Sequence, residues 1–345
     1  MRDLRCPRCG QHLAFENSVC LSCGSRLAFA LEEAAMLAIP DAAGFPGEVV
    51  AAGAYTLCSN LDVAACNWAV AGGGTDVGGL CRSCRLTRTR PNDADSAGMV
   101  QFAAAERAKR RLIAELAELR LPIVGRTEDP EFGLAFDLLS STFEPVSTGH
   151  ENGVITMDLA EVDDVHREHV RVALDEPYRT LLGHFRHEIG HAYFHRLVGA
   201  SLTRYAEFRA LFGDPDADYQ SALDGHYNSA TADSWRDHHV SAYAAMHASE
   251  DWAETFAHYL HIRDTLDTAG AFGLAPDDAT FERNNMRTSA FDEIINMWLP
   301  LAWSLNMVNR SMGRDDLYPF VLPTPVLGKM SFIHTAIEAQ RCPLS

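Results

Sequence analysis

The stretch Gly183-His184-Phe185-Arg186-His187-Glu188-Ile189-Gly190-His191-Ala192-Tyr193-Phe194-His195 contains the pattern His-Glu-x-x-His. If this stretch is helical, His187 and His191 lie one turn apart on one face, where both imidazoles can bind a single Zn²⁺ ion. Glu188 then stands beside the metal, where it can take a proton from water and pass it to a leaving amine. The pattern is typical of a hydrolytic zinc site, although an ordinary amphipathic helix with two solvated histidines also matches it by chance.

The composition is that of a globular protein. Of 345 residues, 47% are hydrophobic and 22% are charged, and the chain is long enough for two domains. No run of about eighteen apolar residues occurs, so no membrane span is expected. The N-terminus goes from Met1 to Cys6 without an apolar signal core, which predicts a cytoplasmic protein. The net charge of −18 makes nucleic acid a poor candidate partner.

Eight of the nine cysteines lie in two groups of four before residue 85, and Cys342 stands alone near the C-terminus. Without a signal sequence, metal binding is favoured over disulfide bonds. The first group forms two Cys-x-x-Cys turns separated by ten residues, which is the pattern of a zinc ribbon with a tetrahedral Cys₄ site. Its expected ligands are Cys6, Cys9, Cys20 and Cys23.

The second group of cysteines contains a single Cys-x-x-Cys pair, preceded by two more widely spaced cysteines. We expect a second structural Cys₄ zinc site here. Two buried cysteines with one reactive pair, or an exchange of ligands between the groups, are the alternatives. The expected ligands are Cys58, Cys66, Cys81 and Cys84.

Four arginines cluster around the last of these cysteines. No aromatic residues alternate with them, as base stacking would require, so a solvated basic turn is favoured over a nucleic-acid-binding ribbon. Residues 91–98 have the composition of a linker to a second domain. The four arginines are Arg82, Arg85, Arg88 and Arg90.

Three segments after the linker predict secondary structure. Residues 102–119 have helical spacing of apolar side chains, with Arg111 and Glu115 as an i,i+4 ion pair. Residues 154–159 form a β-rich run, expected to be either the edge strand that pairs with an extended substrate or a plain core strand. Residues 291–308 carry an apolar helical stripe, which we expect to close the core.

A zinc site of this kind needs a third protein ligand and an open position. The extended metzincin pattern fails, because Phe194 and Leu197 occupy its glycine and third histidine positions. A second predicted helix, with Ser249 as its N-cap, places Glu250 and Glu254 one turn apart. One carboxylate can then ligate zinc while the other accepts the N–H of a ligating imidazole. Alternatively, the acidic pair faces water, or a histidine is the third ligand. The rival histidines are His238, His239 and His247.

The combination of His187-Glu188-x-x-His191 with Glu250-x₃-Glu254 resembles the gluzincin class of zincins, and its spacing from Tyr243 resembles the lethal-factor-like peptidases. These resemblances imply that Glu250 is the third ligand, that Glu254 orients a ligating histidine and that Tyr243 stabilises the oxyanion. Over nearly its whole length the sequence also resembles a bacterial family of zinc-binding metallo-peptidases with an N-terminal zinc-ribbon domain. That likeness rests on the Cys-x-x-Cys pairs, Cys66-Asn67-Trp68, Thr148-Gly149-His150, residues 178–188 and residues 250–254.

Together these features predict an α+β protein. Two zinc-ribbon modules are expected in residues 1–92, and a mostly helical zincin-like metallopeptidase domain in residues 99–345. The expected cofactors are three Zn²⁺ ions, one catalytic and two structural. The expected substrate is a peptide or protein, with Glu188 as general base and the ribbons available to a protein partner. The alternative is a zinc-ribbon adaptor with an inactive or structural zincin domain, which the intact Glu188 disfavours.

Overall fold

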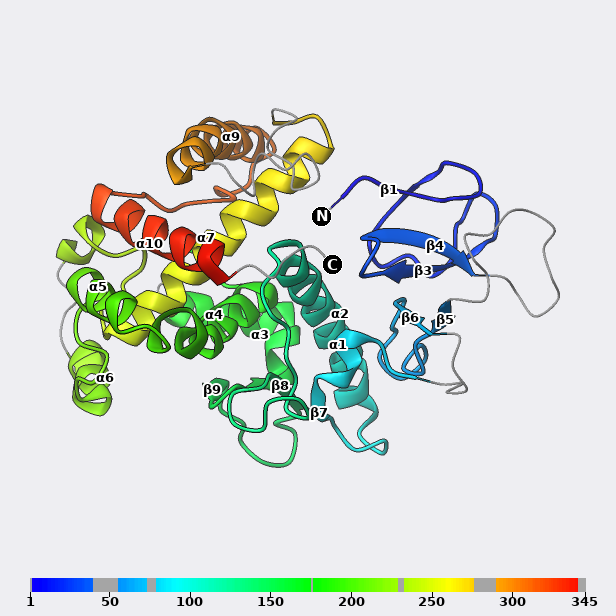
Figure 1. Cartoon of the computed structure of the whole chain (residues 1–345), viewed down its shortest axis with the longest axis horizontal. Helices are drawn as coiled ribbons and strands as arrows, with labels where there is room; N and C mark the ends of the chain where they lie inside the picture. The colour runs from blue at the N-terminus through cyan, green and yellow to red at the C-terminus, as the bar shows by residue number, and fades with distance from the viewer. Residues whose placement is uncertain are drawn as a thin grey trace.

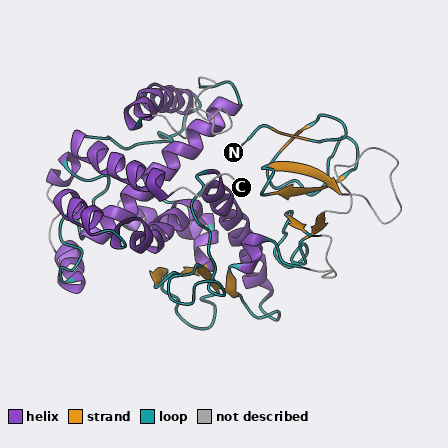
Figure 2. Cartoon of the chain, viewed as in Figure 1, coloured by secondary structure: helices purple, strands orange, loops and turns teal. Residues whose placement is uncertain are grey.

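The computed structural model describes residues 2–39, 55–72, 79–174, 176–228, 233–275 and 290–340, so Cys342 lies outside the described residues. Within these ranges, an N-terminal part built from short strands lies beside a larger and mostly helical part (Figures 1 and 2). This arrangement confirms the predicted α+β class with cysteine clusters before a helical domain.

The N-terminal part is held together by aromatic side chains. Phe15, Phe29 and Trp68 pack with their ring centroids 4.7 to 6.3 Å apart, and the N–H of Phe29 donates to the carbonyl of Asn67. Such rings supply much of the apolar area that a module this small can bury. Around them lie three antiparallel hairpins, which pair β1 (Leu4–Arg5) with β2 (His12–Leu13), β3 (Arg26–Ala30) with β4 (Ala35–Ile39), and β5 (Tyr55–Leu57) with β6 (Ala69–Ala71).

A four-stranded mixed sheet lies next to the helices. Its order is β7 (Thr87–Thr89), β8 (Ala135–Leu139), β10 (Val154–Asp158) and β9 (Gly149–Glu151). The first three strands are parallel, and β9 runs antiparallel to β10 at the edge. Of the two expectations for residues 154–159, the core strand is therefore correct and the edge strand is wrong. The edge position belongs to β9, because the tight turn at Asn152 brings the chain back against β10.

Helices form most of the remaining described chain. The long helix α2 (Ser96–Glu118) covers the predicted helical segment up to its last residue. Residues Phe291, Ile294, Ile295 and Trp298 of α9 are buried, as expected for a closing layer, but the predicted stripe is wrong at its end, where Val308 is exposed. The helices are α1 (Arg82–Arg85), α2, η1 (Leu159–Val162), α3 (Asp164–Ala173), α4 (Leu181–Phe194), η2 (His195–Gly199), α5 (Leu202–Phe212), α6 (Tyr219–Asn228), η3 (Asp233–Asp237), α7 (Ala248–Ala271), α9 (Phe291–Ser311) and α10 (Thr324–Gln340).

The motif helix α4 crosses α7 at very short range. A Cβ atom at Gly190 would lie 3.1 Å from the Cα of Ala253 and 3.2 Å from the Cβ of Phe256. The indole of Trp252 on α7 donates to the Gly190 carbonyl at 2.8 Å. A side chain at position 190 would push the two helices apart, so the glycine within the motif allows residues of both helices to reach one point.

The ends of these two helices are fixed by side-chain caps. The Thr180 hydroxyl accepts a hydrogen bond from the N–H of Gly183 at 3.0 Å and caps α4. The N-cap of α7 is His247 rather than Ser249, because the imidazole Nδ1 accepts the Ser249 N–H at 3.2 Å. After Phe194 the backbone widens into the π-helical turn η2, which ends at Gly199.

Helix α2 joins the two parts of the chain. Arg110 donates to the carbonyls of Ala64 and Ala65 at 3.2 and 2.9 Å. The expected Arg111–Glu115 pair does not form, because the two side chains face different parts. Arg111 pairs with Glu16 of the ribbons at 2.6 Å, and Glu115 accepts from the buried Arg186 at 3.0 Å.

Strand β7 also crosses between the parts, because it precedes the predicted linker and yet pairs with β8 of the helical part. Beside it, Arg88 pairs with Asp137, and Arg82 donates to the Ile123 carbonyl at 2.9 Å. Two of the four clustered arginines therefore bind the second part of the chain, while Arg85 donates to the Leu80 carbonyl and Arg90 pairs with Asp93. Within the described ranges, no helix combines the length and the apolar character that crossing a membrane would need.

Candidate metal centre

Two histidines of α4 and one glutamate of α7 direct their ligand atoms at one place. The Nε2 atoms of His187 and His191 are 3.1 Å apart. Oε2 of Glu250 lies 3.1 Å from the first and 3.4 Å from the second. All three ligand atoms fall within 4.8 Å of one another. The structure thus brings the motif histidines together with the first member of the acidic pair.

The donors of this site fit a Zn²⁺ ion. Nδ1 of His187 lies 2.7 Å from Oε1 of Glu254, so this nitrogen is assigned the proton and the Nε2 lone pair faces the centre. In the described part of the chain, the buried Oε2 of Glu250 has no hydrogen-bond donor. Lone pairs that face one another in a buried site repel unless a cation or proton lies between them. Two nitrogens and one oxygen also leave the fourth position that a catalytic zinc site keeps open.

The pKa values of His187 and Glu250 also indicate that this site favours a bound positive charge. Burial opposes charge on His187, but the carboxylates of Glu250 and Glu254 raise its pKa well above the usual range. Burial opposes ionisation of Glu250 as well, yet the neighbouring imidazoles lower its pKa. Because protons and a metal ion compete for the same lone pairs, acidification is expected to release the metal.

Glu254 fixes the orientation of the His187 ring by contacting the nitrogen that does not face the metal centre. Besides its contact with Nδ1, the carboxylate accepts the hydroxyl of Ser241 at 2.8 Å through Oε2. Burial by itself would raise the pKa of Glu254, but hydrogen bonding to His187 lowers it to about 2. Glu254 is therefore ionised at neutral pH and holds the histidine in the tautomer that a metal needs.

Replacing Glu254 by alanine is expected to weaken zinc binding at this site by roughly 10-fold to 100-fold, because His187 loses the partner that fixes its ring. Chelator competition on the full chain measures the affinity. Glu168→Gln, an exposed carboxylate on α3, is the matched control and should leave it unchanged. An affinity unaltered in Glu254→Ala would show that His187 does not ligate through Nε2.

Glu188 lies against the metal centre without a fixed partner. Burial raises its pKa, the acidic neighbours add to the shift, and the two imidazoles oppose it. Among the described residues, no side chain forms an ion pair or hydrogen bond with its carboxylate. A buried carboxylate with a raised pKa and no fixed partner can act as an acceptor for a proton from water.

Two tyrosines lie near the centre, Tyr243 in the loop before α7 and Tyr219 at the start of α6. The ring centroid of Tyr243 is 6.0 Å from that of His187. Burial and the nearby Glu250 carboxylate raise the pKa of Tyr219, and its hydroxyl also contacts that of Tyr243. No signal in the sequence pointed to Tyr219, because it belongs to a separate helix, α6, that only tertiary packing brings to the site.

The edge strand β9 places one more histidine at the centre. The rings of His150 and His191 lie nearly parallel, at 11°, with centroids 6.2 Å apart. Burial, with a smaller effect from His191, lowers the pKa of His150 to about 4, so the ring is neutral at physiological pH. The sequence marked this residue only as part of a family motif.

The other histidines considered as ligands lie elsewhere. His247 caps α7 and contacts the Ala217 carbonyl at 3.2 Å. His239 lies 3.3 Å from Asp251. His195, at the end of the motif stretch and not one of these rivals, stacks on Phe132 with centroids 3.9 Å apart. The metal centre described above contains none of them, nor His238.

A buried lysine anchors the loop that carries Tyr243. Lys329 of α10 donates to the carbonyl of His238 at 2.8 Å and pairs with Asp251, which is itself buried. This contact ties the start of the loop to both α7 and α10. Sequence reasoning missed it, because nothing local distinguishes a buried lysine from a surface one.

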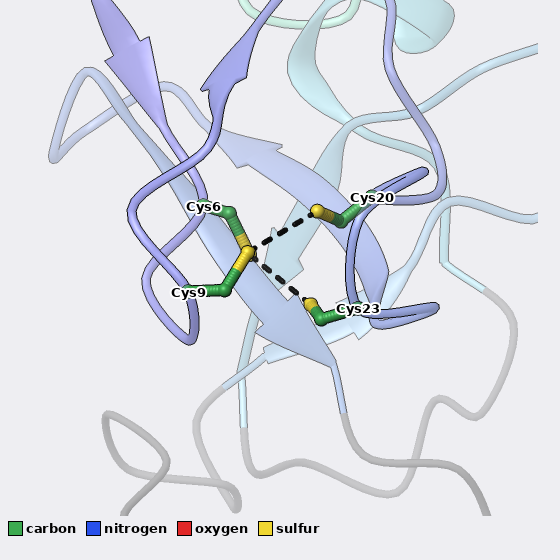
Figure 3. Close-up of side chains that lie close together, drawn as sticks. All are labelled: Cys6, Cys9, Cys20 and Cys23. Atoms are coloured by element: carbon green, nitrogen blue, oxygen red, sulfur yellow. Dashed lines mark hydrogen bonds between the residues drawn. The ribbon is translucent and has the colours of Figure 1, made fainter.

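The first cysteine group converges on one point from two turns (Figure 3). The Sγ atoms of Cys6 and Cys23 are 3.7 Å apart, and those of Cys9 and Cys20 are 3.6 Å apart. A tetrahedron of sulfurs at the usual zinc–sulfur distance has edges of about 3.8 Å. This group can hold a zinc ion.

The second cysteine group also converges, and it is buried throughout. Sγ of Cys66 lies 3.6 Å from that of Cys81, and the Sγ of Cys58 accepts the backbone N–H of Cys81 at 3.3 Å. With Cys84, each of these side chains is at most 2% exposed. The four sulfurs lie within 4.8 Å of one another and do not mix with the first group.

The chain has two Cys₄ clusters near its N-terminus, followed in sequence by a histidine–glutamate centre on two crossing helices. These features define a class of metal-binding proteins with an N-terminal zinc ribbon. Family models divide the chain in the same way. Residues 98–336 match the family described as "Putative zinc-binding metallo-peptidase", and residues 3–95 match a zinc-ribbon domain. The chain belongs to this metallo-peptidase family.

Relatives at high identity cover almost the whole chain. Uncharacterized proteins of Mycobacterium bovis and of two Mycobacterium tuberculosis strains are 63% identical over 338 residues, which is 98% of this chain and 96% of each relative. No solved structure matches the chain.

Proposed function

We propose that this protein is a zinc-dependent peptidase that hydrolyses peptide or amide bonds at the centre formed by His187, His191 and Glu250. One observation carries the proposal: three ligand atoms from two helices converge within 4.8 Å, with the unpaired carboxylate of Glu188 beside them. When bound, Zn²⁺ lowers the pKa of a water molecule and polarises the scissile carbonyl.

The side chains around the centre divide the remaining work. Glu188 accepts the proton of the attacking water and delivers it to the leaving amine. Tyr243 donates a hydrogen bond to the oxyanion that develops on the scissile carbonyl, and contact with Tyr219 supports its hydroxyl. The outer edge of β9 offers backbone groups to an extended substrate, which suits a peptide.

Each cysteine group is proposed to hold one structural zinc ion. The full chain then carries three ions, of which only the histidine-bound ion has an open position. The ribbons serve to stabilise the N-terminal part and to receive a protein partner.

The full-length protein is expected to contain about three zinc ions per chain and to hydrolyse members of a quenched fluorescent peptide library. A chelator should stop hydrolysis and added zinc should restore it. The double variant His187→Ala, His191→Ala should contain about two ions and be inactive. A three-zinc protein that cleaves no peptide would favour the adaptor function, and three ions in the double variant would exclude the histidine site.

A further inference from the structure

His150 lies on the edge strand that we propose pairs with the substrate, and its ring lies near that of the candidate ligand His191. It is the middle residue of β9, pairs with Ile155 of β10, and turns its ring toward His191 on α4. The strand therefore presents two things to one ligand: its outer backbone edge and this imidazole. None of the roles assigned above uses the imidazole.

The hydrogen bonds of His150 fix which nitrogen carries the proton. Nε2 lies 2.8 Å from the backbone N of Gly153, which can only donate, so Nε2 is an acceptor and carries no proton. The neutral ring must then be protonated at Nδ1. The turn that supplies the donor is tight, with φ values of 46° at Asn152 and 84° at Gly153, which holds the ring in place.

The Nδ1–H of His150 has no partner in the described part of the chain. No acceptor lies within hydrogen-bond distance, and the atom is not sealed from solvent. The same bond excludes His150 as a metal ligand, because its one free lone pair is already used by Gly153. A neutral imidazole with a fixed, unused donor can supply a hydrogen bond to whatever binds beside it.

We propose that His150 is a further catalytic residue, which donates a hydrogen bond from Nδ1 to the oxygen of the substrate carbonyl undergoing attack. His150 acts from β9 and Tyr243 acts from the loop before α7, so two donors stabilise the developing negative charge. This inference rests on the proposed peptidase function.

Two amide substitutions separate this role from a structural one. In His150→Asn the amide nitrogen takes the place of Nδ1 and keeps the donor, but the acceptor for Gly153 is lost. In His150→Gln the amide oxygen takes the place of Nε2 and keeps the acceptor, but the donor is lost. If His150 is a catalytic donor, His150→Asn should retain hydrolysis, whereas His150→Gln should lower kcat/KM roughly 100-fold or more. Both variants should keep their full zinc content. If His150 only stabilises the turn, His150→Asn should lose more hydrolysis than His150→Gln.

Binding of acetohydroxamate to the zinc-loaded protein gives a readout independent of turnover. Its oxygens bear negative charge at the metal, so the wild type and His150→Asn should bind it equally, and His150→Gln about tenfold more weakly. Equal affinities of Asn and Gln variants, or weaker binding by Asn than by Gln, would overturn the inference. If the wild type binds hydroxamate with this pattern but cleaves no peptide, the proposed function fails and with it the catalytic role of His150, although His150 would still be shown to donate a hydrogen bond to a ligand at the metal.

Discussion

Replacement of Glu188 by glutamine is expected to lower kcat for peptide hydrolysis by roughly 100-fold to 10,000-fold and to leave the zinc content unchanged. Glutamine keeps the shape of the side chain, but it cannot accept a proton from water or return one to the amine. Glu188 makes no ion pair within the described residues, so its loss should leave α4 in place. The ligand atoms of the site come from other residues.

The pH profile gives the same test a second readout. Burial raises the pKa of Glu188, and the base works only when ionised, so wild-type kcat should fall as the pH drops through that raised pKa. Over the pH range in which the site still holds zinc, Glu188→Gln should lose this acidic limb. Zinc content and thermal unfolding check that the variant is loaded and folded, and Glu168→Gln is again the control. Hydrolysis within a few-fold of wild type in a zinc-loaded Glu188→Gln protein would contradict the assigned mechanism.

Much of the metal centre could be predicted because it depends on the spacing of residues that are close in sequence. His187 and His191 are four residues apart, as are Glu250 and Glu254, and helical periodicity puts each pair on one face. The only long-range requirement is that the two helices cross closely. Gly190 inside the motif allows this close crossing, since even a Cβ atom there would lie only 3.1 Å from the Cα of Ala253.

The features that escaped prediction depend on contacts between distant segments. Tyr219 reaches the centre from α6, and His150 reaches it from β9, and neither has a local pattern that points there. Arg111 shows that a local pattern can also predict a contact that does not form. Its spacing from Glu115 fits an ion pair, but α2 lies between the two parts of the chain. Each of the two side chains therefore pairs with a residue of a different part.

The two cysteine groups differ in how firmly they are joined to the helical part. The second group is fully buried, Arg110 of α2 binds the carbonyls of Ala64 and Ala65 within it, and β7 follows Cys84 directly into the sheet. The first group contains the exposed Cys9, and its ribbon contacts α2 through the partly exposed pair Arg111–Glu16 and the more buried pair Arg2–Glu118. Partly exposed pairs contribute little stability, about 0 to 1 kcal/mol each.

Loss of the second zinc site should therefore destabilise the whole protein, while loss of the first should stay local. Structural zinc ions bind small domains with roughly 10 to 16 kcal/mol, comparable to the entire stability of a domain. Cys84→Ser is expected to lose one zinc ion, to lower the Tm by roughly 10 °C or more and to lose hydrolysis, because β7 and the sheet beneath the metal centre lose their anchor.

Cys9→Ser should also lose one zinc ion, but it should keep hydrolysis and the main unfolding transition. Limited proteolysis with mass spectrometry distinguishes the two variants. In Cys9→Ser new cleavage sites should fall within residues 2–39, and in Cys84→Ser they should extend into β8 and β10. Equal effects of the two substitutions on hydrolysis would mean that the first ribbon supports the active site as directly as the second. The relevant coupling would then run through the buried aromatic contact of Phe29 with Trp68, which connects the two ribbons, rather than through β7.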